Sequence, residues 1–473
     1  MEKTFGKNKK PELLCPASSL EVLKCAVRYG ADAVYIGGES YGLRAKAKNF
    51  SPKEMAEGIA FAHEHGARVH VAVNILAHNY DLEGAAKYFE ELKAMKPDAL
   101  IVADPGMYSI CREVWPEAEI HISTQANNTN YATFNFWYKQ GAKRVVSARE
   151  LSLREIKEIR EKIPEDMEIE SFVHGAMCIS YSGRCLLSNY FTGRDANKGA
   201  CTHPCRWKYT VYEQGENAKD AADGMLTEDG EIRYAIEEES RPGEYLPVYE
   251  NERGTYIFNS RDLCMIEHIP ELLEAGIDSW KIEGRMKTAL YVATVARTYR
   301  RAIDDYFESP EKYEANIPWY REQIAKCTYR KFSTGFFFGK PDENSQIYDN
   351  NTYMSESIFL AIIERTTTRD GAGDPQNSEN PRLAGFTQKN KFCVGDEVEI
   401  MKPDGRDIKV KVLEMYHVCD GGAFEKECDE RLTIGGEECM PVKSCPHAGE
   451  KVYVRFSEQP VAGDIIRMDP VAK

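Results

Sequence analysis

The stretch ELLCPASSLEVLKCAVRYGADAVYIGG, residues 12–38, joins two short apolar runs through a helical pattern that ends in glycine. Short apolar strands that alternate with helices are typical of parallel sheets with helical crossovers. The same unit recurs through about the first 300 residues and predicts strands that start near residues 12, 32, 68, 99, 119, 144, 168 and 279. Eight such units predict a closed (β/α)8 barrel of the TIM type, and an open parallel sheet is the alternative.

One long segment interrupts this pattern between the seventh and eighth predicted strands. Residues 176–260 contain a cysteine-rich stretch followed by an acidic stretch. Segments that follow a barrel strand lie at the carboxyl ends of the strands, where barrel enzymes build their active sites. We therefore expect this Cys-rich insertion to lie at the active-site end of a barrel that spans residues 1–310.

The pattern changes after the barrel. Residues 311–385 read as helical or irregular and include a loop rich in Asp, Asn, Gly and Pro, so we expect them to form a connector. Residues 386–473 alternate short strand-like runs with turns. That alternation predicts a small all-β domain, a barrel or a sandwich, at the C-terminus.

Composition limits the class of protein. The formal net charge of −15 argues against non-specific coating of nucleic acid, although it permits a local basic face. The chain has neither a secretory signal pattern nor an apolar run long enough to cross a bilayer, so we expect a cytoplasmic protein without membrane contact. In a reducing compartment, a cluster among its 14 cysteines favours metal binding or catalysis. Cys15, Cys25 and Cys111 lie inside apolar runs and are expected to be buried packing residues.

The densest group of cysteines lies in HGAMCISYSGRCLLSNYFTGRDANKGACTHPCRWKY, residues 174–209. Its four thiols belong to Cys178, Cys185, Cys201 and Cys205, and intervening glycine and proline residues allow turns on which they can converge. The gaps are wider than the C-x2-C pairs typical of zinc sites, and irregular spacing favours an iron–sulfur cluster. A structural thiol group and a redox disulfide pair are the alternatives.

Three further residues are secondary candidates. His174 and His203 flank the cysteines as alternative ligands, although a histidine beside glycine is more often structural. Cys264 is expected at the start of a helix-like piece, residues 260–276, from which it could reach the same face of the barrel. Its alternative role is a core residue on the apolar stripe of that helix.

A basic and aromatic rim is predicted around the same opening. Arg206 lies among aromatic residues of the cysteine-rich stretch, and the strand-like KIEGR places Lys281, Glu283 and Arg285 on one side. Cations interleaved with aromatic rings suit an anionic substrate or an unstacked nucleotide base. We therefore predict that these four residues bind substrate, and a solvated barrel rim is the alternative.

The motifs of common hydrolases are missing from the sequence. It contains no H-E-x-x-H, no G-x-S-x-G and no glycine-rich phosphate loop. Cys178 and His174 form a formal cysteine-protease pair, but no feature marks them out. Clustered thiols without hydrolase motifs disfavour a protease.

Several longer motifs resemble a known family. ESFVHGAMCISYSGRCLLSNY, RDANKGACTHPCRWKY, NSRDL and SWKIEGRMK, with ELLCPA and GADAVYIGG near the start, closely resemble the collagenase-like peptidases of family U32. The likeness covers about residues 11–310, and the C-terminal β segment resembles that family's small tail domain. Within the family, the chain looks most similar to the branch that makes 5-hydroxyuridine at the tRNA wobble position.

This resemblance implies an iron–sulfur enzyme of tRNA hydroxylation. It implies a 4Fe–4S cluster, prephenate as cosubstrate, tRNA as substrate, and room for a second subunit of the same family as a partner. The cluster ligands of that branch match Cys178, Cys185, Cys201 and Cys205, while another branch of the family keeps Cys264 in view as a replacement. A collagenase-like peptidase and a noncatalytic metal-binding partner in an RNA-modification complex are the alternative functions.

Overall fold

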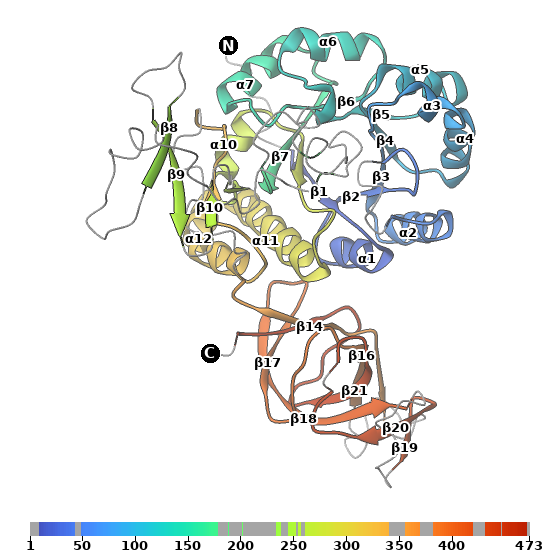
Figure 1. Cartoon of the computed structure of the whole chain (residues 1–473), viewed down its shortest axis with the longest axis vertical. Coiled ribbons are helices and arrows are strands. Elements are labelled where there is room, and N and C mark those ends of the chain that lie inside the picture. Colours follow the sequence, from blue (N-terminus) through green and yellow to red (C-terminus); the bar gives the residue numbers. More distant parts are fainter. Residues whose placement is uncertain are drawn as a thin grey trace, which may run out of the picture.

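The structure is a computed structural model of the chain. The residues described are 9–42, 49–177, 188, 201, 233–237, 245–251, 254–256, 261–339, 355–368, 382–419, 431–445 and 447–470. Figure 1 shows that the N-terminal part forms a barrel surrounded by helices and that the C-terminal part forms a separate β domain. Within these ranges, none of the helices is long and apolar enough to cross a membrane.

Eight parallel strands close into the predicted barrel, because β7 pairs with β12 as well as with β6. All of the predicted strand starts are confirmed to within one residue. The strands are β1 (Glu12–Pro16), β2 (Ala33–Gly37), β3 (Arg68–Val73), β4 (Ala99–Val102), β5 (Ile120–Ile122), β6 (Arg144–Val146), β7 (Glu168–Gly175) and β12 (Ser279–Ile282).

Several of the helices begin at a side chain that caps them. Ser51 Oγ accepts a hydrogen bond from the backbone N–H of Glu54 at 3.3 Å, and the Glu54 carboxylate accepts one from Ser51 N at 3.0 Å. This reciprocal capping satisfies backbone donors that have no partner within the helix. The helices around the barrel are α1 (Leu20–Arg28), α2 (Pro52–Glu64), α3 (Asn79–Leu82), α4 (Ala85–Met95), α5 (Pro105–Val114), α6 (Tyr131–Lys139), α7 (Leu153–Lys162), α10 (Ile269–Glu274) and α11 (Ala289–Glu308), with a 3-10 turn η1 (Thr124–Ala126).

The apolar core lies between the strands and these helices. Cys15, Cys25 and Cys111 belong to it and are buried, which confirms their predicted role in packing. Because these thiols are surrounded by apolar side chains, their burial stabilises the core and they are not accessible to a metal ion.

The segment 260–276 corrects one expectation. It is not one helical piece: Asp262–Cys264 form strand β11, and α10 starts only at Ile269. β6 pairs with β7 only as far as Glu170, so the outer part of β7 has a free edge on that side. β11 pairs with that edge in antiparallel orientation and in turn pairs with β13 (Phe332–Ser333). Satisfying these exposed backbone groups outweighs the helical pattern of the sequence.

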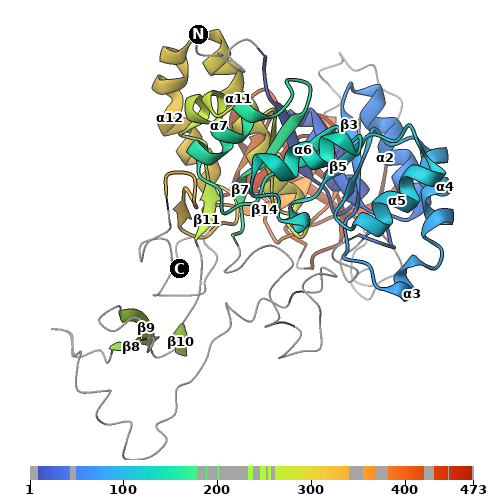
Figure 2. The same ribbon diagram turned by 90° about the horizontal axis from the view of Figure 1, so that it is seen from above.

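The insertion contributes a small sheet of its own. Strands β8 (Arg233–Glu237), β9 (Tyr245–Asn251) and β10 (Gly254–Tyr256) pair in antiparallel fashion. Figure 2 shows these strands beyond the carboxyl ends of the barrel strands, on the same side as α3 and β11. These strands are the described part of residues 176–260 beyond Ala176, Met177, Ser188 and Cys201, and most of that segment lies outside the described residues.

The C-terminal domain is an antiparallel all-β structure, as predicted. It includes β14 and β15, although the sequence assigns their range, 311–385, to a connector. α12 (Pro310–Ala325), at the start of that range, packs on α11. The strands are β14 (Ile358–Ile362), β15 (Arg365–Thr368), β16 (Arg382–Thr387), β17 (Glu397–Met401), β18 (Asp407–Val418), β19 (Leu432–Ile434), β20 (Glu437–Pro441), β21 (Lys451–Phe456) and β22 (Ile465–Met468).

Two buried arginines lie where α11, α12 and the β domain meet. Arg297 of α11 donates to Asp407 at 2.8 Å, and Arg467 of β22 donates to Glu399 at 2.6 Å. Gln323 of α12 accepts from both guanidinium groups. Each buried cation therefore has a carboxylate partner, which compensates for the loss of water around its charge.

Candidate active site at the carboxyl end of the barrel

The ends of β7 and β12 are joined tightly just before the cysteine-rich stretch. The backbone N–H of Glu283 donates to the His174 carbonyl at 2.8 Å. Gly175 has φ +109°, and a Cβ atom at this position would lie 2.5 Å from the Glu283 carbonyl oxygen. Only glycine fits such an approach, and Cys178 follows three residues later. The described chain therefore reaches the carboxyl end of the barrel just before the first predicted ligand in the sequence.

The predicted cysteine ligands lie mostly outside the described residues. This holds for Cys178, Cys185 and Cys205, and also for His203 and Arg206. Cys201 is described and half-buried. Convergence of the four thiols remains a prediction.

Arg149 is a site residue that the sequence reasoning missed. It follows β6, and its Nη1 donates to the Ala176 carbonyl at 3.0 Å, while Nη2 pairs with the Glu283 carboxylate at 2.9 Å. Its guanidinium lies 4.0 Å from the centre of the Phe172 ring. Arg149 thus links the ends of β6, β7 and β12. Its contact at Ala176 is two residues before Cys178 in the sequence. Its place near the end of the strand-like run RVVSARE, residues 144–150, close to where barrel sites form, was the available signal.

Lys281 lies inside the barrel beneath this opening. Its Nζ pairs with Glu170 at 2.7 Å and lies 4.5 Å from the centre of the Tyr35 ring, and the residue is 4% exposed. Burial disfavours the charged form of Glu170, but Lys281 and Arg144 outweigh that effect and lower the pKa of Glu170. Glu170 is therefore ionised at neutral pH, and the Lys281 side chain paired with it faces aromatic rings at the base of the opening.

Glu283 and Arg285 lie in the turn after the last barrel strand. The alternation of KIEGR predicts a strand through residue 285, but β12 ends at Ile282. Arg285 is 7% exposed and donates to Asn49 at 3.2 Å. It lies against Gly37 at the end of β2, where a Cβ atom would be 2.4 Å from its guanidinium. Glu283 and Arg285 are therefore both at the carboxyl end of the barrel, as the sequence predicts for a rim.

His174 and Cys264 face each other across β7 and β11. Burial and the nearby Lys287 lower the pKa of His174 to about 3, so its imidazole is neutral. Burial raises the pKa of the Cys264 thiol to about 12, so it is protonated at neutral pH. His174 Nδ1 lies 3.4 Å from the Tyr299 hydroxyl. A neutral imidazole and a protonated thiol are consistent with residues that pack beside the site.

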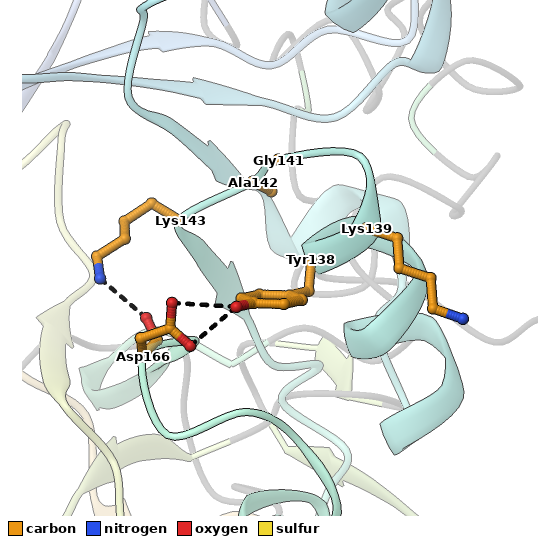
Figure 3. Close-up of a pocket in the computed structure, with 6 residues that line it drawn as sticks. All are labelled: Tyr138, Lys139, Gly141, Ala142, Lys143 and Asp166. Carbon is orange, nitrogen blue, oxygen red and sulfur yellow. Dashed lines mark hydrogen bonds between the residues drawn. The ribbon is translucent and has the colours of Figure 1, made fainter.

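A surface pocket lies at the opposite end of the barrel (Figure 3). It is formed where the chain enters β6 and β7, and Tyr138 donates to the Asp166 carboxylate at 3.0 Å. Lys143 donates to the Asp166 carbonyl at 2.8 Å. Because these polar groups already pair with one another, and because this end of a barrel serves stability, we do not place the active site there.

Comparison with known proteins identifies the family. The family model described as Peptidase family U32 matches residues 18–347, and the model of the Peptidase family U32 C-terminal domain matches residues 371–467. The chain is 42% identical over 397 residues to "tRNA hydroxylation protein P1" of Bacillus subtilis (strain 168), with 84% of both chains covered. It is 41% identical over 410 residues to "tRNA hydroxylation protein P" of Escherichia coli (strain K12), with 84% of this chain and 87% of the relative covered. It is also 28% identical over 459 residues to "Collagenase" of Porphyromonas gingivalis (strain ATCC BAA-308 / W83), with 95% and 98% covered. The resemblance found in the sequence is thereby confirmed, and the chain belongs to peptidase family U32.

Proposed function

We propose that this protein is an iron–sulfur enzyme that hydroxylates the wobble uridine of tRNA to 5-hydroxyuridine with prephenate as cosubstrate. The observation that carries the proposal is the identity of about 40% with relatives named for tRNA hydroxylation, over more than four fifths of the chain. The fold supports it, because β7 ends at the carboxyl end of the barrel, where active sites form, and the cysteine-rich stretch follows β7 in the sequence.

The donor set fits a 4Fe–4S cluster. Four cysteines, Cys178, Cys185, Cys201 and Cys205, match the four thiolates that such a cluster requires. When bound, the cluster would supply electron transfer or activation of the cosubstrate. Of these ligands, the structure describes Cys201, which is half-buried rather than sealed in the core.

The chain's own residues would bind and orient the substrates. Arg149 fixes the backbone at Ala176, so it would position the start of the ligand stretch. Arg285 would provide positive charge at the opening for carboxylate or phosphate groups. Lys281, paired with Glu170 and flanked by Tyr35 and Phe172, would form the base of the opening. Localised positive charge of this kind would let a chain of net charge −15 bind an RNA at one face.

Metal analysis of protein purified without oxygen tests the cofactor. We expect about four irons and four sulfides per chain and a brown colour, as the cluster stoichiometry requires. Cys178→Ala and Cys205→Ala should lose both, while Cys264→Ala should retain them, because burial raises the pKa of the Cys264 thiol and keeps it protonated. A colourless protein without iron would overturn the iron–sulfur assignment.

A collagenase-like peptidase is the second candidate. The observation in its favour is the relative named "Collagenase", which the chain matches over 95% of its own length. Gelatin hydrolysis by metal-free protein, lost in Cys178→Ala, would support this function. If the protein hydroxylates tRNA and leaves gelatin intact, the peptidase function is excluded.

A further inference from the structure

A separate group of metal-binding side chains lies in the C-terminal β domain. It comprises His417 of β18, Cys445 in the loop after β20, and Glu450 immediately before β21. One donor atom from each lies within 4.8 Å of the others. His417 is 9% exposed and Cys445 is 2% exposed, whereas the Glu450 side chain is 20% exposed. The group is therefore buried on the protein side and open toward solvent on one side.

The Nε2 atom of the His417 imidazole is the ring nitrogen that faces Glu450. It lies 4.0 Å from the Glu450 carboxylate, and this is the one ion pair of Glu450 in the described part of the chain. A cation between the two side chains would bind Nε2 and leave the ring proton on Nδ1.

The loop that carries the other two donors is held in place by one buried amide. Gln388 Nε2 donates to the Cys445 carbonyl at 2.8 Å and to the His447 carbonyl at 2.6 Å. The same group lies 3.3 Å from the Glu450 carboxylate. Residues that orient metal ligands in this way are typical of the shell around a metal site.

A similar group inside the barrel is electrostatically unsuited to a metal. Donor atoms of His70, His121 and Glu170 also lie within 4.8 Å of one another. However, the two carboxylate oxygens of Glu170 already pair with Lys281 at 2.7 Å and with Arg144 at 3.1 Å. A divalent ion there would face two buried cations, whereas Glu450 pairs with no lysine or arginine among the described residues.

We propose that His417, Cys445 and Glu450 bind one zinc ion that fastens β18 to the loop before β21. Zinc accepts sulfur, nitrogen and oxygen donors together, and a tetrahedral site places them about 3.3–3.8 Å apart. Three protein ligands leave the fourth position to water on the exposed side. This site is distinct from the cysteine-rich stretch and does not depend on the proposed function.

Zinc and iron measured together on full-length protein test this site. The variants are Cys445→Ala and Glu450→Gln, and the matched control is Cys439→Ala, because Cys439 is a buried cysteine of the same domain outside the group. We expect about one zinc per chain in the wild type and in Cys439→Ala. Cys445→Ala and Glu450→Gln should bind zinc at least about tenfold more weakly, with iron unchanged in all four proteins.

Replacement of zinc by cobalt adds a readout that does not depend on activity. The wild type should show thiolate-to-cobalt charge-transfer absorption, and Cys445→Ala should lack it. Glu450→Gln preserves the side-chain shape and keeps the test valid if Cys445→Ala folds poorly. Zinc content and cobalt spectra that are the same in the wild type, Cys445→Ala and Glu450→Gln would overturn the proposal, as would a wild type that binds neither ion.

Discussion

Replacing Gly175 by alanine tests how the barrel holds the cysteine-rich stretch. The new Cβ would lie 2.5 Å from the Glu283 carbonyl, in a backbone conformation with φ +109°. Backbone strain costs about 1–3 kcal/mol, and overpacking adds about 1–3 kcal/mol. We therefore expect Gly175→Ala to lower the free energy of unfolding of the barrel by about 2–6 kcal/mol. Relief of the contact would separate the ends of β7 and β12, and the iron content should fall with it.

Gly66→Ala is the matched control for this prediction. Gly66 also has positive φ, +74°, but no atom lies within 4 Å of a Cβ atom built there. It should therefore cost only the left-handed backbone strain, about 1–2 kcal/mol, and keep its iron. Urea unfolding followed by circular dichroism compares the two variants, with iron measured on the same samples. Equal loss of stability in both, with equal iron, would refute the proposed role of the tight contact.

Three further predictions concern buried ionisable side chains. Arg149→Met should reduce iron retention and destabilise the barrel by about 3–5 kcal/mol, because it removes the buried cation that pairs with the Glu283 carboxylate. Iron equal to that of the wild type would contradict its positioning role. Arg297→Met should loosen the contact between domains by about 3–5 kcal/mol, seen as two calorimetric transitions and faster proteolysis, whereas a single unshifted transition would contradict the prediction. Burial lowers the pKa of both His70 and His121 far below 6.5, so the unfolded chain binds more protons than the folded one. The free energy of unfolding should be highest above about pH 6.5 and should fall as the pH drops below that value. His70→Gln should weaken this pH dependence, as measured by urea unfolding between about pH 5 and 7.

The barrel could be predicted because its strands and helices are locally coded. Runs such as Ala33–Gly37 are short, apolar and followed by capped helices, and each strand pairs with the next one along the chain. Closure of the barrel could be predicted from the number of strand–helix units alone. The beginning of the C-terminal domain was harder to predict, because β14 and β15 precede the Asp- and Gly-rich loop that reads as a linker.

The site was predictable in its location but not in its contacts. Its place after the seventh strand follows from topology alone. Cys264 was expected in a helix because its neighbours have helical spacing, yet the free edge of β7 draws it into a strand. Arg149 was missed because its role depends on contacts with three residues distant in sequence, Phe172, Ala176 and Glu283. Lys281 shows the same limit, since pairing with Glu170 is a tertiary contact.

The most direct test of the proposed function is the amount of 5-hydroxyuridine formed on unmodified tRNA. Protein purified without oxygen would be incubated with the tRNA and prephenate, and the nucleosides would be quantified by mass spectrometry. We predict product with the wild type and with Cys264→Ala, and none with Cys178→Ala or without prephenate. Wild-type protein with a full complement of iron that forms no 5-hydroxyuridine, or Cys178→Ala that forms as much as the wild type, would contradict the assignment.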